Sequence, residues 1–444
     1  MPLARYILRR RIVIQSAVAT GAKATLGKGI RPQDKPNQMD TITHGIIGAL
    51  IGKAFFAEES PEIQSWVKPP SSSGRVAICA ATVGAIFPDI DTLAGPIAHN
   101  SLAIMTWHRG ITHSIVLLPV WAIGLAVLTR WLAARLRWPA PALGMLFLIY
   151  AAGLGSHIFL DVITPFGTMV WSPLRYTRLA WDWLFIVDLS LTSLALAPQL
   201  AGWAYKRAEE ARNRAVMLWV LFSAGAFALI PITRTLNVPY SPVAAVVATA
   251  LFAVLFLWPL RNPERHVSRG RFCQIGMALV VIYICFAGGM HHLALQRTTS
   301  FATRSGIRAE EIAALPLPPW PARWSGMIAA PDKLYRVELN EFGGKPAALQ
   351  YFLQAPPNQY ITAADTLRDV QIFNWFARFP LIQYSESNGQ PVVSITSMSF
   401  YRGPRQREAP QQQGSGDPGF TNFTYRVVFT SQARVLSHGW VRPE

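Results

Sequence analysis

Residues 141–163 read PALGMLFLIYAAGLGSHIFLDVI, an apolar run that is long enough to cross a bilayer as a helix. A transmembrane helix needs roughly 20 residues. His157 and Asp161 stand four residues apart near the end of this run, so both side chains project from one helix face. Ionisable groups at membrane depth are unfavourable and usually mark a functional site. This stretch therefore predicts a membrane protein with a polar site near the end of one helix.

Other apolar runs of similar character precede and follow this one. Of the 444 residues, 51% are hydrophobic and only 15% are charged, which is too little charge to coat a soluble protein of this size. We predict a mainly α-helical fold, a polytopic transmembrane bundle of about eight helices of which the first two are short. The expected helices lie at 41–57, 75–88, 112–130, 141–163, 183–203, 215–233, 242–260 and 271–293.

The composition divides the chain into four parts. Residues 1–38 form a basic N-terminal extension, either an arm or targeting segment or sequence upstream of a true start at Met39. Residues 39–294 form the transmembrane helical domain, and residues 295–323 form a proline-rich linker. Residues 324–444 form a small soluble C-terminal domain. Its β-strands are expected at 335–339, 349–353, 392–401 and 424–430.

Basic residues are distributed unevenly among the turns between the helices. Thirteen lie after the first, third, fifth and seventh helices, against four after the second, fourth and sixth. The positive-inside rule places the richer set in the cytoplasm, so the other turns and the C-terminal domain face the outer side, which in a bacterial inner membrane is the periplasm. We assign the net charge of +17 to this orientation, and we expect membrane lipids as neighbours and no nucleic acid as partner. A basic arm fits poorly on the outer face, which favours the start at Met39.

Metal-ligand residues cluster at the turns and helix ends that are predicted to share this outer face. They are His44 at the first helix, Asp89 and Asp91 after the second, His108 and His113 before the third, and His157 and Asp161 in the fourth. Asp89 and Asp91 are two residues apart in an expected extended stretch, so both can point to one side. Imidazole and carboxylate groups suit Zn, Mn or Fe, and carboxylates can bridge two ions. The predicted cofactor is therefore a divalent metal, as one or two ions.

Each cluster alone also has an ordinary structural explanation. A single His at a helix end is commonly a cap or an interfacial residue, and Asp-x-Asp commonly forms a turn. Seven such residues at one face of a chain poor in charge argue for a site. Secondary candidates are Asp188 in the apolar fifth helix, and Arg109, Arg175 and Arg178. The arginines either clamp an anionic substrate or extend to the membrane interface.

Four motifs resemble a family of bacterial inner-membrane proteins described as membrane-bound metal-dependent hydrolases, some of them LexA-regulated. The motifs are Met39-Asp-Thr-Ile-Thr-His44, Pro88-Asp-Ile-Asp91, His108-Arg-Gly-Ile-Thr-His113-Ser, and Ser156-His157-Ile-Phe-Leu-Asp161 followed by Thr164-Pro-Phe-Gly. The resemblance covers about residues 39–200. It implies a bound metal and hydrolysis but no particular substrate. Members of the family begin near the position of Met39, which supports a start there.

Three functions fit these observations. The leading prediction is an integral membrane metal-dependent hydrolase, in which metal-activated water attacks an anionic or lipid-borne ester or phosphoester, with Asp89 or Asp161 as the catalytic base. The first alternative is a membrane transporter or metal-binding sensor without hydrolytic activity, because intramembrane His and Asp also mark ion pathways. The second is a structural membrane protein whose polar residues only pair with one another. A site confined to one membrane interface favours the enzyme.

Overall fold

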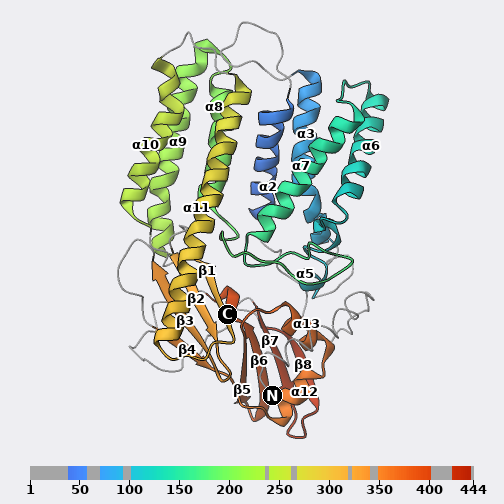
Figure 1. The fold of residues 1–444 in the computed structure, drawn as a ribbon, viewed down its shortest axis with the longest axis vertical. Coiled ribbons are helices and arrows are strands. Elements are labelled where there is room, and N and C mark those ends of the chain that lie inside the picture. The colour runs from blue at the N-terminus through green and yellow to red at the C-terminus, as the bar shows by residue number, and fades with distance from the viewer. Residues whose placement is uncertain are drawn as a thin grey trace.

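The computed structural model describes residues 39–57, 71–93, 102–235, 240–261, 268–318, 323–340, 349–401 and 423–441. A bundle of long helices stands on a strand-rich C-terminal domain, and the two parts are in contact (Figure 1). The predicted mainly helical, polytopic architecture with a strand-rich C-terminal domain is confirmed. Residues 1–38 lie outside the described residues, so the start at Met39 stays a prediction.

The helices follow the predicted order along the chain. They are α2 (Met39–Ile51) continued by the π-helix η1 (Gly52–Phe56), α3 (Ser72–Ile86) continued by the 3-10 helix η2 (Phe87–Leu93), α5 (Ala103–Thr106), the 3-10 helix η3 (Ile111–His113), α6 (Leu118–Leu136), α7 (Leu143–Val162), α8 (Leu189–Ala204), α9 (Ala208–Thr235), α10 (Pro242–Leu257) continued by η4 (Trp258–Arg261), and α11 (Arg269–Arg304). In the described part of the chain, six of these elements are long and apolar enough to cross a membrane.

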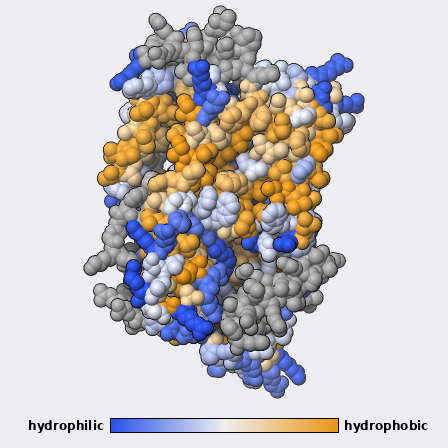
Figure 2. Space-filling view, in the orientation of Figure 1, coloured by the Kyte–Doolittle hydropathy of each residue, from blue (hydrophilic) through white to orange (hydrophobic). Residues whose placement is uncertain are grey.

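The outer surface of the bundle is apolar. Figure 2 shows a broad hydrophobic belt across the visible face of the helices and a more hydrophilic C-terminal domain below it. Large apolar side chains point outward from several helices, among them Leu221, Leu251 and Ile282. Such a belt is the surface that lipid tails cover.

Helix α3 lies close to α2 and α7 because small residues line both contacts. Ala81 and Ala85 of α3 are fully buried. A Cβ atom added to Gly153 of α7 would lie 2.6 Å from the carbonyl oxygen of Ala81. One added to Gly48 of α2 would lie 2.5 Å from the Cβ atom of Ala85. This close packing, typical of membrane helices, brings the start of α2 and the ends of α3 and α7 together.

Several helix boundaries differ from the prediction for local reasons. The third helix begins at Leu118 rather than at 112, because Pro119 fits only a first turn. The fifth begins at Leu189 rather than at 183, with Asp188 as its N-cap. Asp188 is therefore at the helix end and not inside the helix. Helix α11 continues to Arg304, past the predicted end at 293, because its last turns pack on strands β1 and β2.

The C-terminal domain contains two antiparallel four-stranded sheets. One comprises β1 (Glu311–Pro316), β2 (Arg323–Ala329), β3 (Lys333–Asn340) and β4 (Gln350–Leu353), and the other β5 (Pro380–Ser387), β6 (Gln390–Ser397), β7 (Thr424–Phe429) and β8 (Val435–Trp440). Helices α12 (Gln359–Asp365) and α13 (Arg368–Phe376) lie between them in sequence. The segment predicted as a linker, 295–323, holds the end of α11 and all of β1. Proline is tolerated in β1 because this strand is at the edge of its sheet.

An ion pair joins the C-terminal domain to the loop between α7 and α8. Arg378 approaches Asp182 with both terminal nitrogens, at 2.7 and 2.9 Å. Trp181 and Trp183, on either side of Asp182, donate backbone hydrogen bonds to Val162 and Ile163 at the end of α7. The C-terminal domain is therefore fixed at the end of the bundle that carries the predicted site residues.

Candidate metal centre

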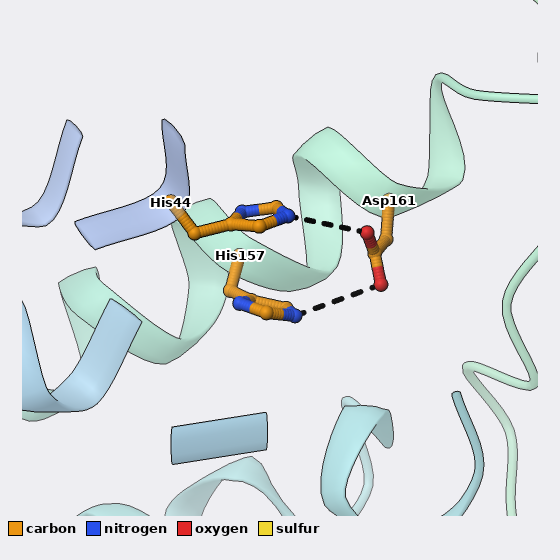
Figure 3. Close-up of side chains that lie close together, drawn as sticks. All are labelled: His44, His157 and Asp161. Atoms are coloured by element: carbon orange, nitrogen blue, oxygen red, sulfur yellow. Dashed lines mark ion pairs between the residues drawn. The ribbon is translucent and has the colours of Figure 1, made fainter. Parts of the chain in front are cut away.

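Five ligand-type side chains meet at the end of the bundle. They are His44 from α2, Asp89 from η2, His113 from η3, and His157 and Asp161 from α7. The side chains of the three histidines and of Asp161 are each at most 3% exposed, whereas that of Asp89 is 13% exposed. Figure 3 shows His44 and His157 reaching the two carboxylate oxygens of Asp161. The predicted convergence of segments distant in sequence is thus present for these five residues.

The ligand atoms form two overlapping groups that share His157. The Nε2 atom of His157 lies 3.0 Å from that of His113 and 3.4 Å from Oδ1 of Asp89. Asp161 places Oδ2 3.2 Å from Nε2 of His113 and Oδ1 3.4 Å from Nε2 of His44. In each group, His44–His157–Asp161 and Asp89–His113–His157, the atoms lie within 4.8 Å of one another. His157 has a single Nε2 lone pair and can bind only one ion, so a second ion would need a carboxylate as the bridging ligand.

Contacts at the far side of two rings fix their tautomers. Nδ1 of His157 lies 2.6 Å from the carbonyl oxygen of Ala85, so it must carry a proton. Nδ1 of His113 lies 3.1 Å from a carboxylate oxygen of Asp91, and it too is a donor. In the neutral rings, both Nε2 atoms therefore carry lone pairs, and these atoms are only 3.0 Å apart. Two facing lone pairs beside two carboxylates require a cation between them.

The cation is either a proton or a metal. Burial lowers the pKa of His113, but hydrogen bonds with Asp161, Asp89 and Asp91 outweigh it and raise the pKa well above its usual value. A proton on His113 therefore balances the cluster when no metal is bound. Three imidazole nitrogens and two carboxylates are also a common donor set for Zn, Mn or Fe. The residues present thus fit a divalent metal.

Asp91 and His108 lie beside the cluster rather than in either ligand group. Asp91 accepts hydrogen bonds from the backbone of Arg109 at 3.0 Å and the hydroxyl of Thr112 at 2.9 Å, and its other oxygen lies 2.9 Å from Nδ1 of His108. Residues 87–93 form a 3-10 helix with three residues per turn, so Asp89 and Asp91 diverge instead of pointing together. Asp91 orients the ring of His113, as outer carboxylates do around metal sites.

This role predicts the effect of Asp91→Asn. The change keeps the shape but removes the charge that holds Nδ1–H of His113, so metal affinity should fall about 10–100-fold. Chelator competition on the purified protein measures it, and Asp332→Asn, at an exposed carboxylate, is the control. An unchanged affinity in Asp91→Asn would contradict the orienting role.

The secondary candidates have mainly structural contacts. Arg109 pairs with Oδ1 of Asp161 at 2.8 Å, and Arg178 donates to backbone carbonyls of Met105, His108 and Gly167. Asp188 accepts hydrogen bonds from the backbone of Leu191 and the hydroxyl of Tyr283, as an N-cap. Arg175 is exposed.

Two hydroxyl groups and a carbonyl that surround the site are not predicted by the sequence patterns. Thr41 donates to Oδ2 of Asp89 at 2.5 Å, and Thr112 donates to Asp91. The carbonyl of Ala85 fixes His157. The signal for the threonines was their place inside the motifs Thr41-Ile-Thr-His44 and Thr112-His113. The role of Ala85 depends on helix packing and has no local sequence signal.

The helical part of the chain is similar to a known family. Residues 39–237 match the family model described as YdjM inner membrane protein. All five converging residues lie within the matched segment. This part of the chain is similar to YdjM. Together with the apolar helices, the likeness to YdjM supports a multi-pass inner membrane protein. The YdjM match ends before α10, α11 and the C-terminal domain, and no curated protein and no solved structure matches the chain.

Proposed function

We propose that this protein is an integral membrane metal-dependent hydrolase of the type that the motifs resemble. His44, His113, His157 and Asp161 would hold the divalent metal, and Asp89 would act instead as the general base. The observation that carries the proposal is the pair of facing Nε2 atoms, 3.0 Å apart, with two carboxylates around them. A bound divalent ion would supply Lewis-acid activation of water and substrate. LexA regulation and the periplasmic orientation are part of the same proposal.

Asp89 is better placed than Asp161 to act as general base. Asp161 is 1% exposed and is paired with Arg109, which stabilises its charged form. Asp89 keeps part of its side chain exposed, and one of its oxygens receives the hydroxyl of Thr41 while the other faces His157. A base must reach the reacting water and release the proton afterwards, which requires an accessible group.

The surroundings of Asp89 favour a substrate with an apolar tail. Ile90, Ile42 and Ile111 lie next to residues that bond within the site, and each is more than half exposed. Apolar side chains that are exposed beside a polar site favour an amphiphilic ligand over a free ion. A lipid-borne ester or phosphoester suits this edge of the site.

The location of the ligands favours an enzyme over a transporter. Among the described residues, both groups of possible metal ligands lie at the same end of the helices. Ion pathways instead place ionisable groups at successive depths of the membrane.

Metal content and hydrolysis test the proposal together. The wild-type protein is purified in detergent, its metals are measured by elemental analysis, and it is assayed with bis(p-nitrophenyl) phosphate, p-nitrophenyl butyrate and phosphatidylglycerol vesicles. His113→Ala and His157→Ala should no longer bind the metal. Their hydrolysis rate should fall at least about 100-fold, which is more than is typical when a residue around a metal ligand is changed. His292→Ala, at an exposed histidine bonded to Gln296, is the control.

The outcomes separate the three functions. Metal that is lost in both variants, together with hydrolysis, supports the enzyme. Metal without hydrolysis of any probe would indicate a sensor or transporter. A wild-type protein without metal, even after loading with Zn²⁺ or Mn²⁺, would leave only the structural explanation.

A further inference from the structure

We propose that the C-terminal domain completes the metal centre, with Phe376 as a positioning residue that fixes Arg109 and, through it, the carboxylate of Asp161. The metal is that of the proposed function, on which this role rests. The C-terminal domain lies outside the segment similar to YdjM, so the family match does not suggest this role.

Phe166 lies where the two domains meet. Its ring centroid is 5.2 Å from that of Phe376 in α13, and the rings of Phe400 and Phe423 are at 6.1 and 6.5 Å. The rings of Phe376, Phe400 and Phe423 also stack on one another. Phe166 belongs to the loop after α7, and its three aromatic neighbours belong to the C-terminal domain. The aromatic cluster of that domain therefore sets the position of Phe166.

Phe166 in turn contacts the arginine that holds a metal-facing carboxylate. The guanidinium carbon of Arg109 lies 5.0 Å from the ring centroid of Phe166. The same guanidinium approaches Oδ1 of Asp161 at 2.8 Å and donates to the hydroxyl of Thr164 at 2.9 Å. A cation over an aromatic ring is stabilised most where water is excluded, and Arg109 is 3% exposed. Packing on Phe166 thus fixes the geometry of the buried ion pair.

Arg178 makes a second connection between the same parts. Its guanidinium carbon lies 5.2 Å from the ring centroid of Phe376 and 5.3 Å from that of Phe166. It donates hydrogen bonds to the carbonyls of Met105 at 2.7 Å and His108 at 2.9 Å. These carbonyls precede the segment that carries His113. Phe376 therefore contacts two residues of the α7–α8 loop, of which Phe166 packs on Arg109 and Arg178 bonds to the segment before His113.

Two alanine variants of the full-length protein separate positioning from general destabilisation. Phe376→Ala removes the ring that contacts Phe166 and Arg178. Phe429→Ala is the matched control, because Phe429 is fully buried in the same hydrophobic core and packs on Tyr360 of α12. The Zn²⁺ dissociation constant is measured in nanodiscs by chelator competition. Phe376→Ala should weaken binding about 10–100-fold, as changes around metal ligands do, whereas Phe429→Ala should leave it unchanged.

Hydrogen exchange of the metal-free protein provides a readout that needs no ion. Peptides covering residues 105–113 and 161–170 should exchange faster in Phe376→Ala than in wild type, and at the wild-type rate in Phe429→Ala. Equal effects of the two variants, or no effect of Phe376→Ala, would overturn the positioning role. If wild type binds no Zn²⁺, the proposed function fails, and the exchange comparison still decides whether Phe376 positions these segments.

Discussion

Asp161→Ala is expected to remove metal binding and to lower the free energy of unfolding by about 3–5 kcal/mol, the loss typical of a broken buried ion pair. Asp161 is 1% exposed and faces the Nε2 atoms of His113 and His157. Its other partner, Arg109, is 3% exposed and would keep its charge without a carboxylate. One substitution therefore removes a ligand and also the carboxylate that balances the buried charge of Arg109.

A double variant separates these two effects. Arg109→Met combined with Asp161→Leu removes both charges and keeps apolar volume, so most of the lost stability should return. Metal should remain absent, because the carboxylate is still missing. Denaturant unfolding in micelles, followed by tryptophan fluorescence, gives the stability, and elemental analysis gives the metal. Metal retention in Asp161→Ala would exclude Asp161 as a ligand.

Gly153→Ala should destabilise the bundle by about 1–3 kcal/mol, the range for overpacking of a tight contact, and should weaken metal binding as well. The added Cβ atom would lie 2.6 Å from the carbonyl oxygen of Ala81, a backbone atom that cannot move alone. Helix α7 would have to shift away from α3. That shift would strain the hydrogen bond from Nδ1 of His157 to Ala85, which is 2.6 Å long and directs Nε2 into the site.

Gly144→Ala provides the matched control in the same helix. A Cβ atom on Gly144 meets nothing within 4 Å, so the change should be neutral or slightly stabilising through the higher helix propensity of alanine. Both variants are compared by thermal unfolding and by Zn²⁺ affinity. If Gly153→Ala behaves like Gly144→Ala, the close crossing of α3 and α7 does not determine the site.

The sequence was sufficient to predict the helices and the convergence of the site. Hydrophobic runs of bilayer length fix the helix order, and alternating helix ends brought His44, His113 and His157 to one place. The sequence did not predict that Asp89 faces the ligand cluster while Asp91 orients His113, because this difference depends on the 3-10 geometry of residues 87–93. An extended stretch would have directed both carboxylates to the same side.

The C-terminal domain was harder to predict, because its strands lack a simple pattern. In β2 five consecutive residues are buried, so the alternation that marks a half-buried strand is absent. In β1 the proline content suggested a linker, although an edge strand tolerates proline at its end. Residues 404–419 are rich in Gln, Gly and Pro, which predicts a flexible loop, and they lie outside the described residues. The contacts of Phe376 with Phe166 link positions 210 residues apart, and no local signal reveals such a pair.

Helix α11 extends well beyond the lipid. At 1.5 Å per residue, its 36 residues measure roughly 54 Å, against a hydrocarbon thickness of about 30 Å. Its last turns pack on β1 and β2. One continuous helix thus connects the membrane-spanning part to the C-terminal domain. A change in bilayer thickness that alters the tilt of α11 would also change the orientation of the C-terminal domain, so the protein would respond to membrane thickness.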